Sequence, residues 1–398
     1  MPVYGPNSDI QHGGPVPIKD FSKKSKPAFG AAHISRDQRE KILVGIERGL
    51  LTRAGLEREK PDREYASFSL SEIARECLRA ANQDYSGRRL EMIGRALATT
   101  DLSSILGNVA NKALFEGWKD APETWPVWVD EGSLPDFKES SIAKISEASD
   151  LDEIPEEGEY HYGTRSDSNE TIQLVTYGKL FGYSRQSIVN DDLNALIAGP
   201  KAHGAAAARK VGDVVYAVLT ANGTMGDGVA LFNAATHGNY VAVASGAAPG
   251  TATIGAGIQA MKTQTDLAGL RKLNIRPEYF IAPVALEGTA EVFFRSERFS
   301  DTDTIATDSS LASTRTNPYA GNYFTRVYDA RLDDDSETAW YLAARKGRTV
   351  KVFFLDGVRE PYVETRPGWS VDGIELKIRI DAVAAALDYR GLYCNEGT

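Results

Sequence analysis

DLDEIPEEGEYHYGTRSDSNETIQLVTYGKLFGYS, residues 150–184, is the stretch that decides the predicted fold. Its first part is strongly acidic, with carboxylates at Asp150, Asp152, Glu153, Glu156, Glu157 and Glu159. Its last part alternates with a period of two, which predicts a strand whose apolar face carries Val175, Tyr177, Phe181 and Tyr183. From Asp130 to Ser184 the pattern predicts a long polar hairpin with little core of its own. Such a hairpin is stable only on another surface, so the stretch favours a subunit built for assembly.

A long helix is predicted directly after this strand. Asn190 or Asp191 is expected to cap a short first segment, which Gly199 and Pro200 would end or kink. Apolar residues then recur at spacings of three and four up to Asn222, at Ala208, Val211, Val215 and Val218. A helix that is apolar on one side is expected to be a spine on which sheets pack.

The remaining patterns predict an α+β chain. The first third is expected to be helical, with capping boxes at Ser35 and Ser69. A small-residue loop at 241–250 is interpreted as a domain boundary. In the last 60 residues, segments 349–355 and 358–365 predict an antiparallel hairpin around Asp356 and Gly357, and residues 374–380 alternate as a further strand.

Composition narrows the class of protein. The chain has 398 residues, enough for two or more cores, and a formal charge of -10, which disfavours a protein that grips nucleic acid backbones. Cys77 and Cys394 are expected to be buried free thiols rather than a disulfide. Neither a secretory signal near the first residue nor an apolar run of about 20 residues is found in the sequence.

A search for chemistry finds no catalytic pattern. The sequence lacks a phosphate-binding GxxxxGK[ST] loop, HExxH, GxSxG and CxxC, and its five histidines lack metal-ligand spacing. The densest carboxylates, Asp333, Asp334, Asp335 and Glu337, are interpreted as a solvated turn, as are Asp301 and Asp303. No catalytic, cofactor-binding or metal-binding residue is predicted, although carboxylates paired in space for glycoside hydrolysis leave no mark in a sequence.

Five stretches, in this order, carry a resemblance to a known family: TTDLSSILGNVANKALFEGW (99–118), RPEYFIAPVALEGTA (276–290), ARLDDDSETAWYLAA (330–344), FFLDGVREPYVET (353–365) and VDGIELKIRIDAVAAALDYRGLY (371–393). They resemble the major capsid, or major head, proteins of tailed bacteriophages, specifically the Mu-like major head subunit family. That family is also found fused behind a prohead protease.

The resemblance implies the tailed-phage major capsid fold. It assigns an N-terminal arm to residues 1–65, a helical segment to 66–129 and an extended β-hairpin loop to 130–184. A peripheral domain with its spine helix would follow at 185–245, an axial domain at 246–345, and a returning peripheral sheet with the C-terminus at 346–398. Residues 1–65 are either a native arm or what remains after processing.

The implied function is a structural subunit, not an enzyme, that self-assembles through pentamers and hexamers into an icosahedral head shell. The shell would enclose double-stranded DNA without binding it specifically, with decoration, portal, and scaffold or protease proteins as further partners. The protein would be assembled in the bacterial host cytoplasm, become part of the virion, and use neither cofactor nor membrane. An encapsulin-like nanocompartment shell and an α+β enzyme are the alternatives.

The predicted hairpin supplies the candidate contacts between subunits. Its aromatic face would rest on an adjacent subunit, and its acidic tip would meet basic groups there, so that charge pairing fixes the register. The candidate contact residues are Glu153, Glu156, Glu157, Glu159, Val175, Tyr177, Phe181 and Tyr183.

Overall fold

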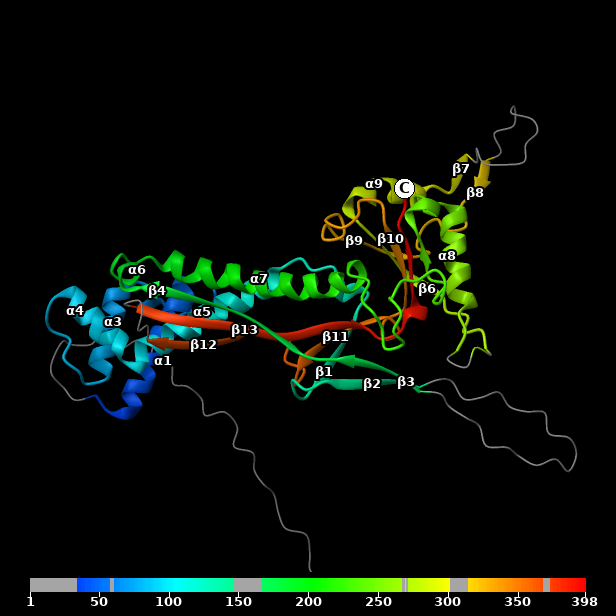
Figure 1. Ribbon diagram of the computed structural model, residues 1–398. Helices are drawn as coiled ribbons and strands as arrows, with labels where there is room; N and C mark the ends of the chain where they lie inside the picture. The colour runs from blue at the N-terminus through cyan, green and yellow to red at the C-terminus, as the bar shows by residue number, and fades with distance from the viewer. Residues whose placement is uncertain are drawn as a thin grey trace, which may run out of the picture.

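The computed structural model describes residues 34–57, 61–145, 167–266, 269, 271–300, 314–367 and 373–398. The molecule is elongated, with a group of helices at one end and a second sheet at the other (Figure 1). The long helix α7 (Leu193–Thr220) and the long strand β13 (Gly373–Ala386) run between the two ends. Helices and sheets are mixed as expected, so the α+β class is confirmed.

The helical end is built by five helices: α1 (Arg36–Arg53), α2 (Arg63–Ala66), α3 (Leu70–Ala80), α4 (Arg89–Ala98) and α5 (Thr100–Asp120). Both predicted capping boxes are present, with Ser35 and Gln38 at the start of α1 and Ser69 and Glu72 at the start of α3. After α5 comes a short 3-10 helix, η1 (Trp125–Val127), and the buried Trp128 packs against α7 through Tyr216.

Helix α5 and helix α7 cross with their backbones in contact. A Cβ atom at Gly117 would lie 2.0 Å from the Lys201 carbonyl oxygen, and one at Gly204 would lie 2.0 Å from the Leu114 carbonyl oxygen. Real Cβ atoms do not approach backbone atoms so closely. Glycine at both positions is therefore what allows the two helices to pack at this distance.

Pro200 lies inside α7 and does not end it, which corrects one of the two predicted alternatives, an end of the helix there. A kink at this position stays a prediction. The expected cap is also displaced by one residue, because the Asp192 side chain accepts from the Ala195 backbone N–H at 3.1 Å. Asp191 instead has a positive φ of 57° and follows the short helix α6 (Arg185–Val189). Its carboxylate accepts from the Arg53 guanidinium and from the Leu70 backbone N–H at 2.7 Å, which joins α1 and α3 to the start of α7.

The first sheet has five strands with β13 at its centre: β1 (Asp130–Leu134), β4 (Val175–Ser184), β11 (Val350–Leu355), β12 (Tyr362–Pro367) and β13. β11 and β12 pair with different halves of β13, and β4 pairs antiparallel along its other side. The predicted hairpin between 349–355 and 358–365 is therefore wrong. Asp356 and Gly357 have positive φ and do form a turn. The strand that follows the turn, β12, pairs with β13 and not with β11.

The predicted hairpin from Asp130 to Ser184 is shorter than expected. β1 pairs in parallel with β11, and β4 pairs with β13, so both ends of the stretch belong to the first sheet. Among the described residues of this stretch, only β2 (Ser140–Ile145) and β3 (Asp167–Ile172) pair with each other. Figure 1 shows these two strands leaving the subunit on the side away from α3, α4 and α6.

The second sheet has the order β5 (Tyr240–Val241), β14 (Leu392–Asn395), β10 (Trp340–Ala344), β6 (Pro277–Ala282) and β9 (Thr325–Tyr328). α8 (Thr251–Thr263) and α9 (Glu287–Arg295) pack around a core that contains Phe280, Phe294 and Trp340. Three short 3-10 helices, η2 (Val243–Ser245), η3 (Val284–Leu286) and η4 (Tyr389–Gly391), and the paired strands β7 (Arg298–Ser300) and β8 (Thr314–Thr316) complete the described elements.

Separate apolar clusters hold these parts together, as expected for a chain of this length. One fills the helical end and includes the first residues of β13. A second joins α7 to both sheets, and a third lies under α8 and α9. Cys77 and Cys394 are buried and free, as predicted, and burial raises the pKa of Cys77 to about 12.

Substitution of Gly204 tests the close crossing of α5 and α7. Gly204→Ala should lower the free energy of unfolding of the unassembled subunit by about 2 kcal/mol or more, because the new methyl group meets rigid backbone. Gly288→Ala in α9 is the matched control, since a Cβ there meets no atom within 4 Å. Urea denaturation should show Gly288→Ala to be neutral or slightly stabilising, and equal costs at both sites would contradict the packing argument.

Substitution of Asp191 tests the junction between α1, α3 and α7. Burial alone would raise the pKa of Asp191, but hydrogen bonds from Arg53 and Leu70 outweigh it and lower the pKa. Asp191→Asn should therefore cost about 1–2 kcal/mol at pH 7, and the difference should shrink as the pH falls below about 4, where wild-type aspartate takes up protons on unfolding. Asp192→Asn, one residue on, keeps a good N-cap and should be neutral in the same denaturation series.

Candidate assembly surface

Tyr183, at the end of β4, completes the hydrogen bonding of α7. Proline has no backbone N–H, so Pro200 cannot donate to the carbonyl of Leu196, four residues earlier. The Tyr183 hydroxyl donates to that carbonyl at 2.8 Å instead, and the ring is only 7 % exposed. Burial raises the pKa of this hydroxyl well above its usual value, so it remains a donor. A tyrosine that satisfies a freed carbonyl explains why α7 continues through its proline.

Two further aromatic residues of β4 contact the same helix. The Phe181 ring stacks on the His203 imidazole with centroids 4.8 Å apart and planes 28° apart. The Lys210 ammonium lies 4.8 Å from the centre of the Tyr177 ring. Since Tyr177, Phe181 and Tyr183 alternate along the strand, all three lie on the face of β4 that meets α7.

These contacts correct the predicted role of Tyr183. We expected all three rings to rest on an adjacent subunit, but Tyr183 is buried within its own subunit. Tyr177 and Phe181 are half-buried on their own α7, and their contact with a neighbour stays a prediction. Val175, at the start of β4, is 45 % exposed. The predicted acidic contacts Glu153, Glu156, Glu157 and Glu159 lie outside the described residues. Sequence reasoning recognised the strand, but it could not identify which surface the strand covers.

The opposite face of β4 and β13 is open and polar. Leu180 lies between Gly178 and Gly182 and is 62 % exposed. The Arg379 guanidinium carbon lies 4.7 Å from the centre of the Tyr362 ring on β12. Arg366 pairs with Glu375 at 2.7 Å, and Lys377 pairs with Glu364. These charges already have partners within the subunit, so this face presents the exposed side chains of Leu180 and Tyr362 among paired ions.

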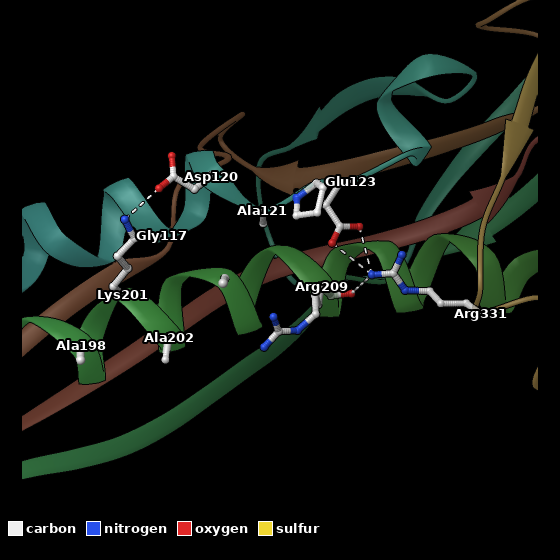
Figure 2. A pocket seen from close by; sticks show the side chains of 11 residues that line it. Gly117, Asp120, Ala121, Glu123, Ala198, Lys201, Ala202, Arg209 and Arg331 are labelled. Carbon is white, nitrogen blue, oxygen red and sulfur yellow. Dashed lines mark hydrogen bonds and ion pairs between the residues drawn. The ribbon is translucent and has the colours of Figure 1, made fainter.

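A groove between α5 and α7 has ion pairs at its two ends (Figure 2). At one end the Lys201 ammonium lies 2.9 Å from Asp120 and 3.3 Å from Glu116. At the other end Arg331 binds Glu123, Asp213 and Asp329 at 3.0, 2.7 and 3.1 Å. Alanine side chains of α7 also line the groove, namely Ala198, Ala202 and Ala205.

Arg331 ties the second sheet to the helices, because it follows β9 while Asp213 is on α7 and Glu123 follows α5. Burial opposes its charge, but hydrogen bonds to Asp213 and Glu123 outweigh burial and raise the pKa of Arg331. Burial also raises the pKa of Glu123, and Arg331 offsets this only in part. At this end of the groove Arg331 is paired with Glu123, Asp213 and Asp329, while Arg209 also lines the groove and is exposed. No serine, cysteine or histidine lines the groove. No pattern in the sequence indicated this cluster.

One carboxylate of the run that was interpreted as a solvated turn has a structural role. Asp333 accepts from the backbone N–H groups of Val284 and Ala285, both at 2.8 Å, and so holds the start of η3. Asp301 and Asp303 lie outside the described residues. Within those residues no group of three potential ligands is placed to hold a metal ion, and no helix is long and apolar enough to cross a membrane.

Comparisons with known proteins were made for the whole chain. A family model described as phage capsid protein matches residues 169–395. No curated protein matches the chain. Solved structures that are similar include one titled Mycobacterium phage Adephagia, with 14 % identity and a TM-score of 0.41, covering 69 % of this chain and 90 % of that chain.

Two further solved structures are also similar to the chain. The capsid of a native GTA particle has 12 % identity and a TM-score of 0.45, covering 69 % of this chain and 90 % of that chain. A virus-like particle from Pyrococcus furiosus has 8 % identity and a TM-score of 0.40, covering 73 % of this chain and 98 % of that chain. These scores describe a general likeness, and the family assignment depends on the sequence match.

A double-mutant cycle tests the bond between Tyr183 and α7. Tyr183→Phe should cost about 1–3 kcal/mol, because it leaves the Leu196 carbonyl buried without a donor. In a Pro200→Ala background residue 200 can donate to that carbonyl, so the cost of Tyr183→Phe should fall below about 1 kcal/mol. Chemical denaturation of the unassembled subunit gives all four values, and an unchanged cost in both backgrounds would show that the hydroxyl does not replace the missing bond.

Proposed function

Because this chain belongs to the phage capsid protein family, we propose that it is the major subunit of an icosahedral head shell that encloses double-stranded DNA. The match over more than half of the chain is the observation that carries this conclusion. The protein is a structural component of the virion capsid that self-assembles, and it is not an enzyme. Family membership therefore rejects the α+β enzyme and favours a phage shell over an encapsulin-like compartment.

We assign parts of the shell subunit to the observed elements. Helix α7 would be the spine, and the sheet around β13 would form the peripheral domain with α5. The second sheet with α8 and α9 would form the axial domain. A core of its own under α8 and α9 supports a separate axial domain. The cluster that joins α7 to both sheets and the Arg331 ion pairs would hold this domain to the peripheral domain. Membership of the Mu-like subfamily remains a prediction.

The hairpin of β2 and β3 would be the arm that lies on an adjacent subunit. Its base is fixed, because Leu134, Ile172 and Leu174 pack with Phe353 of the first sheet. Beyond that base, each of the two strands pairs only with the other among the described residues. A lone two-stranded hairpin is marginally stable in water, so a neighbouring subunit would supply the missing surface.

The charge balance suits a shell that encloses DNA without adhering to it. A formal charge of -10 per copy repels phosphate backbones at long range. The shell would be assembled in the host cytoplasm from pentamers and hexamers, with decoration, portal, and scaffold or protease proteins as further partners. A strongly basic inner wall in an assembled shell would contradict this part of the proposal.

Deletion of residues 150–160 tests the arm. The unassembled variant should melt at the temperature of the wild type, because the described core does not include these residues. Shell formation should be lost, as judged by sedimentation and negative-stain electron microscopy. Replacement of the same residues by a glycine and serine linker of equal length controls for loop closure and should also fail. Normal shells from either variant would remove the arm from the assembly mechanism.

A further inference from the structure

Glu170 is a buried carboxylate in a hairpin that has little core of its own. It lies on β3, two residues before Ile172 of the hairpin base, and is 8 % exposed. Along the chain Glu170, Ile172 and Leu174 alternate with exposed residues, so the three side chains lie on the same face. Ile172 and Leu174 pack on the first sheet, whereas Glu170 brings a carboxylate to that face. A buried carboxylate is costly unless hydrogen bonds compensate for its lost hydration.

The loop that follows α7 supplies such a hydrogen bond. The backbone N–H of Gly226 donates to the Glu170 carboxylate at 2.9 Å. The two backbones also meet, because a Cβ atom at Gly226 would lie 2.1 Å from the Asn169 carbonyl oxygen. Glycine at position 226 is therefore what allows the loop to reach the hairpin. We call residues 223–232 the supporting loop.

Backbone hydrogen bonds and a buried anchor hold the supporting loop in one shape. The Met225 N–H donates to the Val229 carbonyl at 2.8 Å, and the Gly228 N–H donates to the Met225 carbonyl at 2.9 Å. The Leu231 N–H donates to the Gly223 carbonyl at 3.0 Å, which joins the two limbs of the loop. Met225 and Leu231 are buried in the apolar cluster that joins α7 to both sheets. The loop is therefore a firm support rather than a mobile cover.

Asp227 connects the supporting loop to the second sheet. Its carboxylate lies 2.8 Å from the Nε2 atom of the buried His237. The other ring nitrogen of His237, Nδ1, lies 3.1 Å from the Leu231 carbonyl oxygen. The imidazole stacks on the Tyr389 ring of η4, with centroids 3.7 Å apart and planes 8° apart. Because η4 directly precedes β14, the loop links the hairpin to the second sheet.

We propose that Glu170 is a positioning residue for assembly, because its bond to the supporting loop sets the direction in which the β2 and β3 hairpin leaves the subunit. This inference rests on the proposed function, in which the hairpin lies on an adjacent copy. The hairpin then sets the angle between two copies, and one angle repeated around a ring closes rings of one size. Loss of the bond lets the hairpin move about its apolar base, so that copies differ in angle.

Spin labels measure the direction of the hairpin in the unassembled full chain. One label is attached at Lys144→Cys, which pairs with Ser168 in the outer half of the β2 and β3 ladder, and the other at Ala206→Cys, an exposed position on α7. The pulsed-EPR distance distribution between them should be one narrow peak. Glu170→Ala should widen this peak about two-fold or more. Glu170→Gln should keep it narrow, because the amide oxygen still accepts from the Gly226 N–H.

The supporting loop gives an independent test of the same contact. Gly226→Ala places a methyl group against the β3 backbone and should widen the distance distribution as Glu170→Ala does. Gly223→Ala, in the same loop, is the matched control and should leave the peak narrow, since a Cβ there meets no atom within 4 Å. Cys77 and Cys394 are buried, so a chain without the introduced cysteines should take up no label.

Assembly shows whether the direction of the hairpin sets the shell. The wild type should give shells of one diameter in negative-stain images. Glu170→Ala should reduce the fraction of shells with that diameter about five-fold or more, and Glu170→Gln should retain it. Ile254→Val, in the core under α8, is the control for stability. It should lower the urea midpoint of the free subunit and still give shells of one diameter, because it does not touch the hairpin or its support.

The outcomes separate this inference from the proposed function. A narrow peak in both Glu170→Ala and Gly226→Ala, or a wide one in Glu170→Gln, would show that this bond does not position the hairpin. A widened peak with shells of one diameter would show that the direction of the hairpin does not set the shell. A wild type that forms no shells would contradict the proposed function, while the distance measurement would still decide whether Glu170 positions the hairpin. Widened peaks, mixed shells and rescue by glutamine would establish the inference.

Discussion

The contact between the backbones of α5 and α7 is the constraint on which the subunit depends. Gly117 and Gly204 allow the two helices to lie closer than any side chain would permit. The pair then forms one continuous support, with β12 packed on α5 and β13 on α7. Because β13 pairs with β4, β11 and β12, its position fixes the whole first sheet. A displacement of the helices would therefore be transmitted to every strand beside them.

Local patterns in the sequence predicted elements, but pairing and partners required the structure. The alternation of Ile374, Leu376, Ile378 and Ile380 identified β13, and serine with Gln38 or Glu72 identified the starts of α1 and α3. We predicted that β11 and β12 pair with each other, which is wrong. A turn at Asp356 and Gly357 is equally compatible with a hairpin and with two strands that both pair with β13. Pro200 was expected to end or kink the helix. The sequence pattern could not show that the Tyr183 hydroxyl, from a different element, donates to the Leu196 carbonyl in place of the missing backbone N–H.

For the candidate assembly surface, too, the sequence predicted the elements but not their contacts. The acidic run and the aromatic strand were recognised from composition and period, and both remain in the proposed contact. Their relation changed for Tyr183, which is buried within its own subunit, while Tyr177 and Phe181 also contact their own helix. No pattern in one sequence reports which charges are paired, since that depends on which carboxylates the fold brings near. The Arg331 cluster was missed for the same reason.

The distribution of counterions separates surfaces that hold the subunit together from surfaces that can bind another copy. Where charges meet within the chain, as at Arg331 or between Arg366 and Glu375, desolvation has already been compensated and a second partner gains little. The hairpin of β2 and β3 is different, because beyond its base each strand pairs only with the other among the described residues. A second copy placed against it supplies contacts that the described part of the subunit does not. For that reason we expect this hairpin, rather than the paired charges, to meet a neighbour.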